Sequence, residues 1–233
     1  MKVFGLSGNM LKIIAAISMA IDHIGVILFP DIMLLRIIGR LAFPIFAFLI
    51  AEGCRYTKNR LRYFSVLALF AVVFQVFYTL FTKDMYLNIF FTLALAVLII
   101  YGLQLLSSAI QSRSVIKIIF SAASVILIIA CVYIAGEYFL IDYGFWGCML
   151  PAFAYVIPVS KSIVMKLLRI ALFAVGMFPV IKSIDVPVQA YSYFALIPLL
   201  LYNGKRGKYN MKYFFYIFYP VHIVIIYAIG ACL

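Results

Sequence analysis

The chain has 233 residues, 68% of them hydrophobic and 11% charged, and a mean hydropathy of +1.19, whereas a soluble domain is about 45–50% apolar and about 25% charged. Because a soluble core of this length cannot enclose so much apolar surface, the composition excludes a soluble enzyme, a disordered chain and a secreted disulfide scaffold. The net charge of +12 predicts no nucleic-acid binding, since a polytopic membrane protein collects Lys and Arg in its cytoplasmic loops.

Apolar runs follow one another along the whole chain. A helix that crosses the hydrocarbon needs about 20 mostly apolar residues. Cutting the sequence at charged residues, Gly, Pro and Asn gives runs at residues 10–29, 34–54, 63–81, 89–108, 115–135, 143–160, 165–181, 190–202 and 213–232. We therefore expect an all-α transmembrane bundle of about nine spans that forms a single domain over residues 1–233, with no soluble domain.

The connections between these runs alternate in charge. Every second connection is strongly basic, through Arg55, Lys58, Arg60 and Arg62, then Arg113 and Lys117, then Lys161 and Lys166, then Lys205, Arg206, Lys208 and Lys212. The intervening connections carry the acidic residues Asp31, Asp84, Glu137, Asp142 and Asp185. The positive-inside bias then predicts a cytoplasmic N-terminus, an external C-terminus and a multi-pass protein of the bacterial cytoplasmic membrane.

A few ionisable residues fall inside the apolar runs, where each costs at least about 2.5–3.5 kcal/mol to insert and is a functional candidate by default. They are Asp22, His23, Arg36, Arg40, Glu52 and His222. No metal site is expected, because the four cysteines are scattered without a ligand spacing.

Asp22, His23 and Arg40 are expected at one depth. At 1.5 Å per residue, His23 lies about 9 Å inside the outer end of the first run, and Arg40 lies about 9 Å inside the outer end of the second. The short turn between the runs makes the two helices antiparallel neighbours, so Asp22 is expected to pair with Arg40 or Arg36.

This cluster has two interpretations. In the structural one, the ion pair locks two helices together and His23 hydrogen-bonds beside it. In the functional one, carboxylate, imidazole and guanidinium form a reaction site, because an Asp that orients a His recurs in general-base catalysis. His222, which follows Pro220 in the last run, is either a structural group at a kink or a second catalytic imidazole.

The connection after the second run also has two interpretations. Glu52, Arg55, Lys58, Arg60 and Arg62 lie within one short stretch, which is either a topogenic basic loop or a docking site for a phosphate-bearing donor. Arg suits the second role, because its guanidinium matches phosphate with two parallel hydrogen bonds.

Five blocks of the sequence resemble the TraX family of integral-membrane proteins. They are LSGNMLKIIAAISMAIDHIG at 6–25, LLRIIGRLAFPIFAFLIAEGCRYTKNR at 34–60, LNIFFTLALA at 87–96, DYGFWG at 142–147 and KYFFYIFYPVHIVIIY at 212–227. The name-giving member acetylates the N-terminus of a conjugative pilin subunit, and the family is distantly similar to membrane acyltransferases that O-acetylate surface glycans. The resemblance therefore implies transfer of an acetyl group from acetyl-CoA to an amine or hydroxyl acceptor.

Combining resemblance and depth gives an expected mechanism. His23 deprotonates the acceptor, Asp22 holds the tautomer of His23, Arg40 or Arg36 stabilises the oxyanion, and His222 is the rival base or an acyl relay. The acetyl group reaches them either through a channel between helices or on a pantetheine arm. A proton-coupled transporter and a structural subunit of a fimbrial or secretion assembly are the alternatives, since intramembrane Asp and His also serve proton relays.

Overall fold

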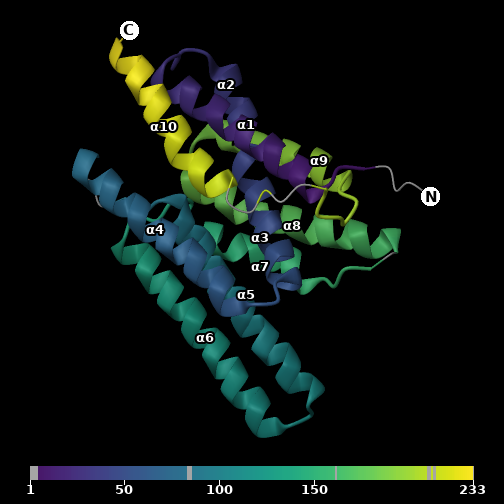
Figure 1. Ribbon diagram of the computed structural model, residues 1–233. Helices are drawn as coiled ribbons and strands as arrows, with labels where there is room; N and C mark the ends of the chain where they lie inside the picture. The colour runs from purple at the N-terminus through teal and green to yellow at the C-terminus, as the bar shows by residue number, and fades with distance from the viewer. Residues whose placement is uncertain (1–4, 83–85, 161, 209–210, 212–213, 233) are drawn as a thin grey trace.

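The computed structural model describes residues 5–82, 86–160, 162–208, 211 and 214–232, and this part of the chain is all-α (Figure 1). Its helices are α1 (Gly8–Ile27), α2 (Met33–Gly39), α3 (Ala42–Tyr56), α4 (Arg60–Thr82), α5 (Ile89–Gln111), α6 (Val115–Tyr138), α7 (Gly144–Val156), α8 (Ile163–Ile184), the 3-10 helix η1 (Pro187–Ala195), α9 (Leu196–Leu200) and α10 (Phe214–Cys232).

Seven of the described segments are long and apolar enough to cross a membrane: α1, the α2–α3 pair, α4, α5, α6, α8 and α10. The chain is thus an integral, multi-pass membrane protein whose outer helices contact the lipid bilayer. Seven of the about nine expected spans are thus long apolar helices, and the other two runs form shorter elements. The sixth forms only α7, with 13 residues, and the eighth forms η1 followed by the five residues of α9.

Prolines explain these short elements. Pro158 pushes Ile157 out of the helical region, and Ile157 ends α7 in an extended conformation (ψ 122°). In the eighth run, Pro198 lies in the first turn of α9, and without an N–H it cannot make the α-helical hydrogen bond to the carbonyl of Phe194, so the α-helix does not extend back into the preceding segment. The segment instead takes the tighter i to i+3 pattern, opened by Pro187.

A proline also divides the second run. Pro44 lies in the first turn of α3, where its missing N–H and its ring disfavour an α-helical bond to the carbonyl of Arg40. The chain therefore leaves the helix at Arg40 and Leu41, between α2 and α3. Arg40 thus lies at a joint between two helices rather than in a helix interior.

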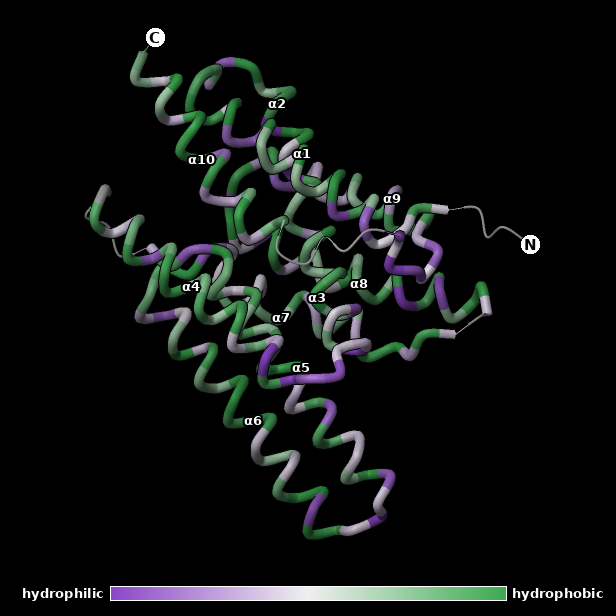
Figure 2. The backbone as a smooth tube through the Cα atoms, in the orientation of Figure 1, coloured by the Kyte–Doolittle hydropathy of each residue, from purple (hydrophilic) through white to green (hydrophobic). Residues whose placement is uncertain are grey.

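The centre of the bundle is α3, which contacts α1, α5, α7 and η1. Most of its side chains are buried, including Phe43, Phe48 and Ala51. By contrast, Val125 and Val132 are the buried residues of α6, and Figure 2 shows hydrophobic residues along nearly all of that helix. A helix that is apolar on its outer side is expected where lipid is the solvent.

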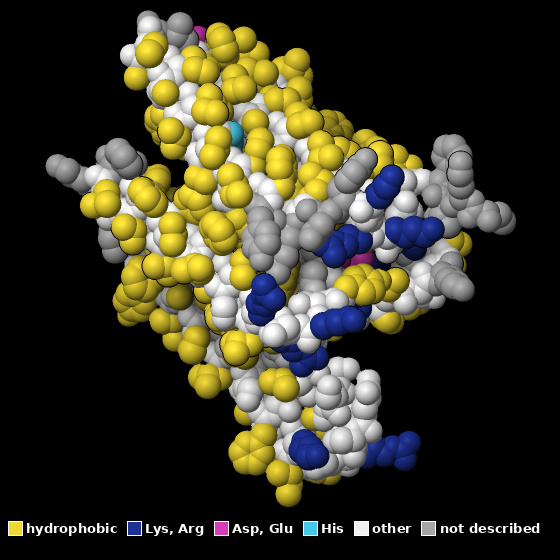
Figure 3. Space-filling model, viewed as in Figure 1, with side chains coloured by type: hydrophobic (Ala, Val, Ile, Leu, Met, Phe, Trp, Pro, Cys, Tyr) yellow, Lys and Arg dark blue, Asp and Glu magenta, His cyan; other side chains and the backbone are white. Residues whose placement is uncertain are grey.

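The two ends of the bundle differ in charge. We call "basic end" the end where α1 begins, next to residues 57–59 and 201–208; there Gly8 and Asn9 donate backbone hydrogen bonds to the carbonyls of Lys205 and Arg206. Figure 3 shows Lys and Arg side chains gathered at this end and an almost wholly hydrophobic face over α1 and α10. At the opposite end a Cβ on Gly230 of α10 would touch Ile27 and Leu28, so α1 and α10 run parallel.

Candidate active site

Three charged residues meet in the half of the bundle away from the basic end. Arg40 Nη2 lies 2.6 Å from Asp22 Oδ1 and 2.5 Å from Oδ2, and Arg36 Nη1 lies 3.2 Å from Oδ2. The expected pairing of Asp22 is confirmed with both arginines. Two guanidinium groups face one carboxylate, so this ion cluster carries one net positive charge.

Gly39 makes this approach of α2 to α1 sterically feasible. A Cβ at position 39 would lie 2.1 Å from Asp22 Oδ1 and 2.3 Å from Asp22 Cβ, far inside van der Waals contact. A glycine between Arg36 and Arg40 therefore lets the carboxylate sit against the backbone of α2, with a guanidinium on either side.

Arg40 has one donor left over. Its Nη1 donates to Gln189 Oε1 of η1 at 3.0 Å, and its Nη2 is used by Asp22. Its Nε is buried without a hydrogen-bond partner among the described residues, as is Ser192 Oγ, one 3-10 turn after Gln189. Because leaving a buried donor unsatisfied costs about 1–3 kcal/mol, the Nε–H of Arg40 is a candidate contact for a substrate oxygen.

The two histidines of the chain lie against each other beside this cluster. His23 Nδ1 is 2.7 Å from His222 Nε2, and the rings stack with centroids 4.9 Å apart. His222 Nδ1 is 2.7 Å from the carbonyl oxygen of Phe218, one turn earlier on α10. Sequence reasoning found both histidines separately, but it did not place them in contact, because they are 199 positions apart.

The expected hydrogen bond from His23 to Asp22 is not formed among the described residues. The carboxylate of Asp22 is taken by the two arginines, and the Nδ1 of His23 is taken by His222. The physical reason is competition: a charged guanidinium fork binds a carboxylate more strongly than a neutral imidazole N–H does.

A second carboxylate, which sequence analysis treated only as a loop charge, lies near this site. Asp142 Oδ1 accepts a hydrogen bond of 2.8 Å from the hydroxyl of Tyr86, and its backbone carbonyl accepts one of 2.6 Å from Thr92. Burial raises the pKa of Asp142 to about 6, while the Tyr86 hydrogen bond and the charge of Arg40 act in the opposite direction. The DYGFWG block thus contributes an acidic group at the edge of the site.

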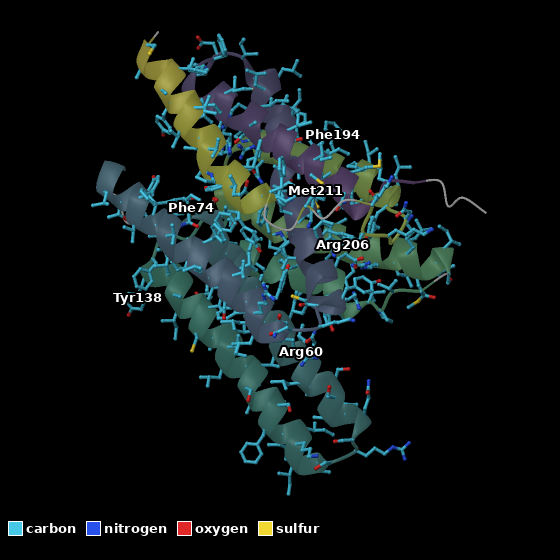
Figure 4. The ribbon with its side chains drawn as sticks, in the orientation of Figure 1. Arg60, Phe74, Tyr138, Phe194, Arg206 and Met211 are labelled. Carbon is cyan, nitrogen blue, oxygen red and sulfur yellow. The ribbon has the colours of Figure 1, made fainter. Side chains whose placement is uncertain are left out.

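A large cavity leads from the basic end toward the histidines. It has a volume of about 740 Å³, within the usual range of about 300–1,000 Å³ for ligand pockets. Lys12, Arg62 and Arg206 line its outer part, and Figure 4 shows Arg206 at that end. Met19 and Tyr219 line its inner part.

The inner part of the cavity lies next to the histidine pair. The Tyr219 ring packs edge-on against His222, with centroids 5.8 Å apart, and Met19 precedes His23 by about one turn on α1. Phe74 of α4 supports Tyr219 from the other side, with ring centroids 5.4 Å apart (Figure 4). Met19 and Tyr219 thus place the inner wall of the cavity next to the imidazoles.

Of the residues expected to bind a phosphate-bearing donor, Glu52 and Arg62 line the cavity, whereas Arg55, Lys58 and Arg60 do not. The guanidinium of Arg55 instead donates to the carbonyls of Ala154, Tyr155 and Ile157 at the end of α7. Lys58 and Arg60 are exposed. The prediction of a phosphate site rested on the number of basic residues in this loop. Arg55 instead lies at the C-terminal end of α7, where a cation is stabilised.

Glu52 itself is held by a residue that sequence analysis missed. Arg169 Nη2 lies 2.5 Å from Glu52 Oε1, and the hydroxyl of Tyr202 lies 2.9 Å from Oε2. Arg169 also donates to the carbonyl of Ala154 and stacks over the ring of Phe48. Arg169 falls inside the run 165–181, so the search for ionisable residues within apolar runs, which selected Asp22, would also have found Arg169.

Comparison with known proteins gives two relatives and no solved structure that matches significantly. The chain is 28% identical over 249 aligned positions to a Dichelobacter nodosus protein named "Probable fimbrial assembly protein FimC, serogroup H1", with 94% of each chain covered. It is 37% identical over 76 positions to an uncharacterized protein of Rickettsia prowazekii (strain Madrid E), covering 33% of this chain and 29% of that one.

The family model described as "TraX protein" matches residues 7–230, which include the ion cluster, both histidines and every residue of the cavity. The resemblance found in the sequence blocks is confirmed over most of the chain, which belongs to the TraX family.

Proposed function

We propose that the protein is a membrane-embedded acetyltransferase, which moves an acetyl group from cytoplasmic acetyl-CoA to an amine or hydroxyl of a pilin-like or cell-surface acceptor. The observation that carries this proposal is the cavity that begins among Lys12, Arg62 and Arg206 and ends beside His23 and His222. A polyanionic donor fits a basic opening, and an acyl transfer needs a base at the other end.

The proposal places the basic end in the cytoplasm, where acetyl-CoA is found. It includes nine passages through the bacterial cytoplasmic membrane, with α7 and the η1–α9 segment as the two short ones. Support comes from Ile157, which meets Arg55 at the basic end, and from Gln189, which meets Arg40 in the other half of the bundle. The excess of Lys and Arg at the basic end agrees with the positive-inside rule.

The dimensions of the cavity suit a donor with a pantetheine arm. Such an arm is comparable in length with an extended peptide of about five residues, roughly 17 Å. Lys12 lies about 16 Å from His23 along α1. Phosphates held by Lys12, Arg62 and Arg206 would therefore leave the thioester close to the histidine pair, and Glu52 at the wall is neutralised by Arg169.

The reaction then follows from the charges of the site. An imidazole of the pair takes the proton of the acceptor N–H or O–H, and the acceptor atom forms a bond to the thioester carbonyl carbon. Arg40, through its unpaired Nε–H and the net positive charge of the ion cluster, stabilises the negative charge on the carbonyl oxygen. The C–S bond breaks, and the leaving thiolate receives the proton from the imidazole.

The acceptor class is supported by the relatives. A protein that aligns over 94% of this chain carries the name of a fimbrial assembly protein, which favours a surface or pilus subunit as the acceptor. An acceptor at the cell surface also agrees with a reaction centre in the half of the membrane away from the basic end.

The test uses the purified chain in lipid nanodiscs with radiolabelled acetyl-CoA and a panel of amine and hydroxyl acceptors. We expect thiol release that depends on an acceptor and is lost in His23→Gln. If the wild type releases no thiol and transfers no label, the proposal is wrong. Proton flux in proteoliposomes would then favour the transporter, and co-purification with fimbrial subunits would favour a structural role.

A further inference from the structure

We propose that the two histidines have fixed and different roles: His222 is a positioning residue that holds His23 in its Nδ1–H tautomer, so that His23 Nε2 is the nitrogen that meets the acceptor. The assignment of a catalytic base rests on the proposed acetyl transfer. The assignment of the tautomers rests on the hydrogen bonds alone.

The argument starts at Phe218. Its carbonyl oxygen can only accept a hydrogen bond, so the nitrogen 2.7 Å away, His222 Nδ1, must carry a proton. A neutral imidazole has one N–H and one lone pair. His222 Nε2 is therefore the acceptor nitrogen of this ring.

The same reasoning then fixes the partner ring. His222 Nε2 lies 2.7 Å from His23 Nδ1, and a hydrogen bond at this distance needs one proton between the two nitrogens. Because His222 Nε2 contributes the lone pair, His23 Nδ1 contributes the N–H. The remaining nitrogen, His23 Nε2, keeps its lone pair and has no hydrogen-bond partner among the described residues.

Packing separates the two roles further. His222 is 6% exposed, both of its nitrogens are occupied, and its ring lies between those of Phe218 and Tyr219, with centroids 4.8 and 5.8 Å away. It leaves no atom for a substrate. His23, by contrast, is only partly buried.

The pair can also move a proton without breaking its geometry. When His23 Nε2 takes the proton of the acceptor, His23 becomes cationic, and its Nδ1–H can shift to His222 Nε2, where the Phe218 carbonyl stabilises the charge. When the Nδ1 proton returns along the same hydrogen bond to His23, the proton on His23 Nε2 passes to the leaving thiolate. Each transfer breaks one bond to hydrogen and forms one, from the acceptor N–H or O–H at the start to the thiol S–H at the end, so no further reactant is needed.

Two histidines in the whole chain make a direct test feasible. Protein labelled with nitrogen-15 histidine, purified without a histidine tag, is examined by NMR in nanodiscs at neutral pH. We expect Nδ1–H and unprotonated Nε2 for both rings, although the opposite tautomer dominates in free histidine. Finding Nε2–H on His222 or on His23 overturns the assignment, whether or not the protein transfers acetyl groups.

Matched variants of His222 test the positioning role. His222→Gln keeps an acceptor oxygen where Nε2 stands, so His23 should stay in the Nδ1–H form with less than a tenfold loss of turnover. His222→Leu removes the acceptor at similar volume, so His23 should revert to the Nε2–H form with a loss of about 10²-fold. Equal turnover in the two variants overturns the positioning role. If the wild type shows the expected tautomers but transfers no acetyl group, the proposed function is overturned and the tautomer assignment stands.

Discussion

At the scale of single residues, the cluster around Asp22 contains more charge than an ion pair between two helices needs. One carboxylate suffices to pair with one guanidinium, yet Asp22 faces both Arg36 and Arg40. The excess positive charge of this cluster favours a negative charge on a bound carbonyl. A buried site with such a field is typical of electrostatic catalysis.

The first prediction separates catalysis from structure at this cluster. His23→Gln keeps similar size and should lower turnover by about 10²–10⁴-fold, because a general base contributes that much, while folding and insertion are unchanged. Turnover with acetyl-CoA and thermal stability in detergent are the measurements. Parental turnover in His23→Gln would show that the reaction site lies elsewhere.

A paired substitution serves as the structural control. Asp22→Asn alone leaves two partly buried cations without a counter-charge and should destabilise the protein by about 3 kcal/mol. Adding Arg40→Gln removes one of these cations and should restore much of that stability. The double variant should still be inactive, because it lacks the guanidinium expected to face the carbonyl oxygen.

The second prediction concerns Asp142 and pH. Its pKa is raised by burial from 3.8 to about 6, so its neutral form is favoured in the folded state. The resulting stabilisation is complete below about pH 4, where the unfolded group is also protonated, and is lost as pH rises through about 6. Asp142→Asn should therefore show a smaller fall in melting temperature between pH 5 and pH 7.5 than the wild type.

Tyr86→Phe supplies the comparison for Asp142. Removing the hydroxyl removes a hydrogen bond that lowers the pKa of Asp142, so the fall in stability should extend to higher pH. An unchanged pH dependence in both variants would contradict the assigned cause.

The sequence predicted the ion cluster correctly, because the free-energy cost of inserting a charged side chain into the membrane was enough to select its members. Asp22, Arg36 and Arg40 were selected by depth, and their pairing followed from the short turn between two runs. The contact of His23 with His222 could not be predicted, because no local pattern joins α1 to α10. The hydrogen bond from Arg40 to Gln189 and the unpaired Nε of Arg40 also could not be predicted, because they depend on the position of η1 beside α2.

At the scale of elements, hydropathy located the apolar segments, and Pro44, Pro158 and Pro198 decided where three of them are interrupted, whereas α8 and α10 continue through Pro179 and Pro220. The runs at 10–29, 89–108 and 115–135 became single long helices, and Asn88 caps α5 by accepting a hydrogen bond from the N–H of Phe90. The runs containing Pro44 and Pro198 did not. A hydropathy window reports the environment of a segment, whereas its hydrogen-bond pattern depends on where N–H groups are missing.

The third prediction concerns the opening of the cavity. Lys12→Gln, Arg62→Gln and Arg206→Gln should each raise the apparent KM for acetyl-CoA by about tenfold, because a charge-assisted phosphate contact at a wet opening contributes about 1.5 kcal/mol. Turnover at saturating donor should stay close to parental. Steady-state kinetics over a range of acetyl-CoA concentrations measures both quantities.

Arg113→Gln and Lys117→Gln are the matched controls, since both residues lie at the turn between α5 and α6, outside this cavity. Arg55→Ala tests the alternative site and should lower stability rather than donor affinity, because it removes the hydrogen bonds to the end of α7. If Arg55→Ala raises the KM for acetyl-CoA and Arg62→Gln does not, the donor binds at the connection after α3 and not at the opening of the cavity.

At the scale of the whole molecule, the parallel course of α1 and α10 has a topological consequence. Both helices begin at the basic end, so an odd number of passages must separate the two ends of the chain. Seven long helices alone satisfy this condition, and so do nine passages that include α7 and η1–α9. The orientation of the chain ends therefore cannot distinguish the two counts.

The last prediction uses the loops on either side of α8, where the counts give opposite answers. With nine passages, position 159 is cytoplasmic and position 185 external; with seven, both are reversed. In a chain whose four cysteines are replaced, Val159→Cys should react with a membrane-impermeant maleimide only after permeabilisation, and Asp185→Cys should react in intact cells. Restoring Cys232 alone gives an external control, and Asn203→Cys a cytoplasmic one, under either count. The reversed pattern at 159 and 185 would remove α7 and η1 from the membrane. It would contradict the contacts that Ile157 makes with Arg55 at one end and Gln189 makes with Arg40 in the other half.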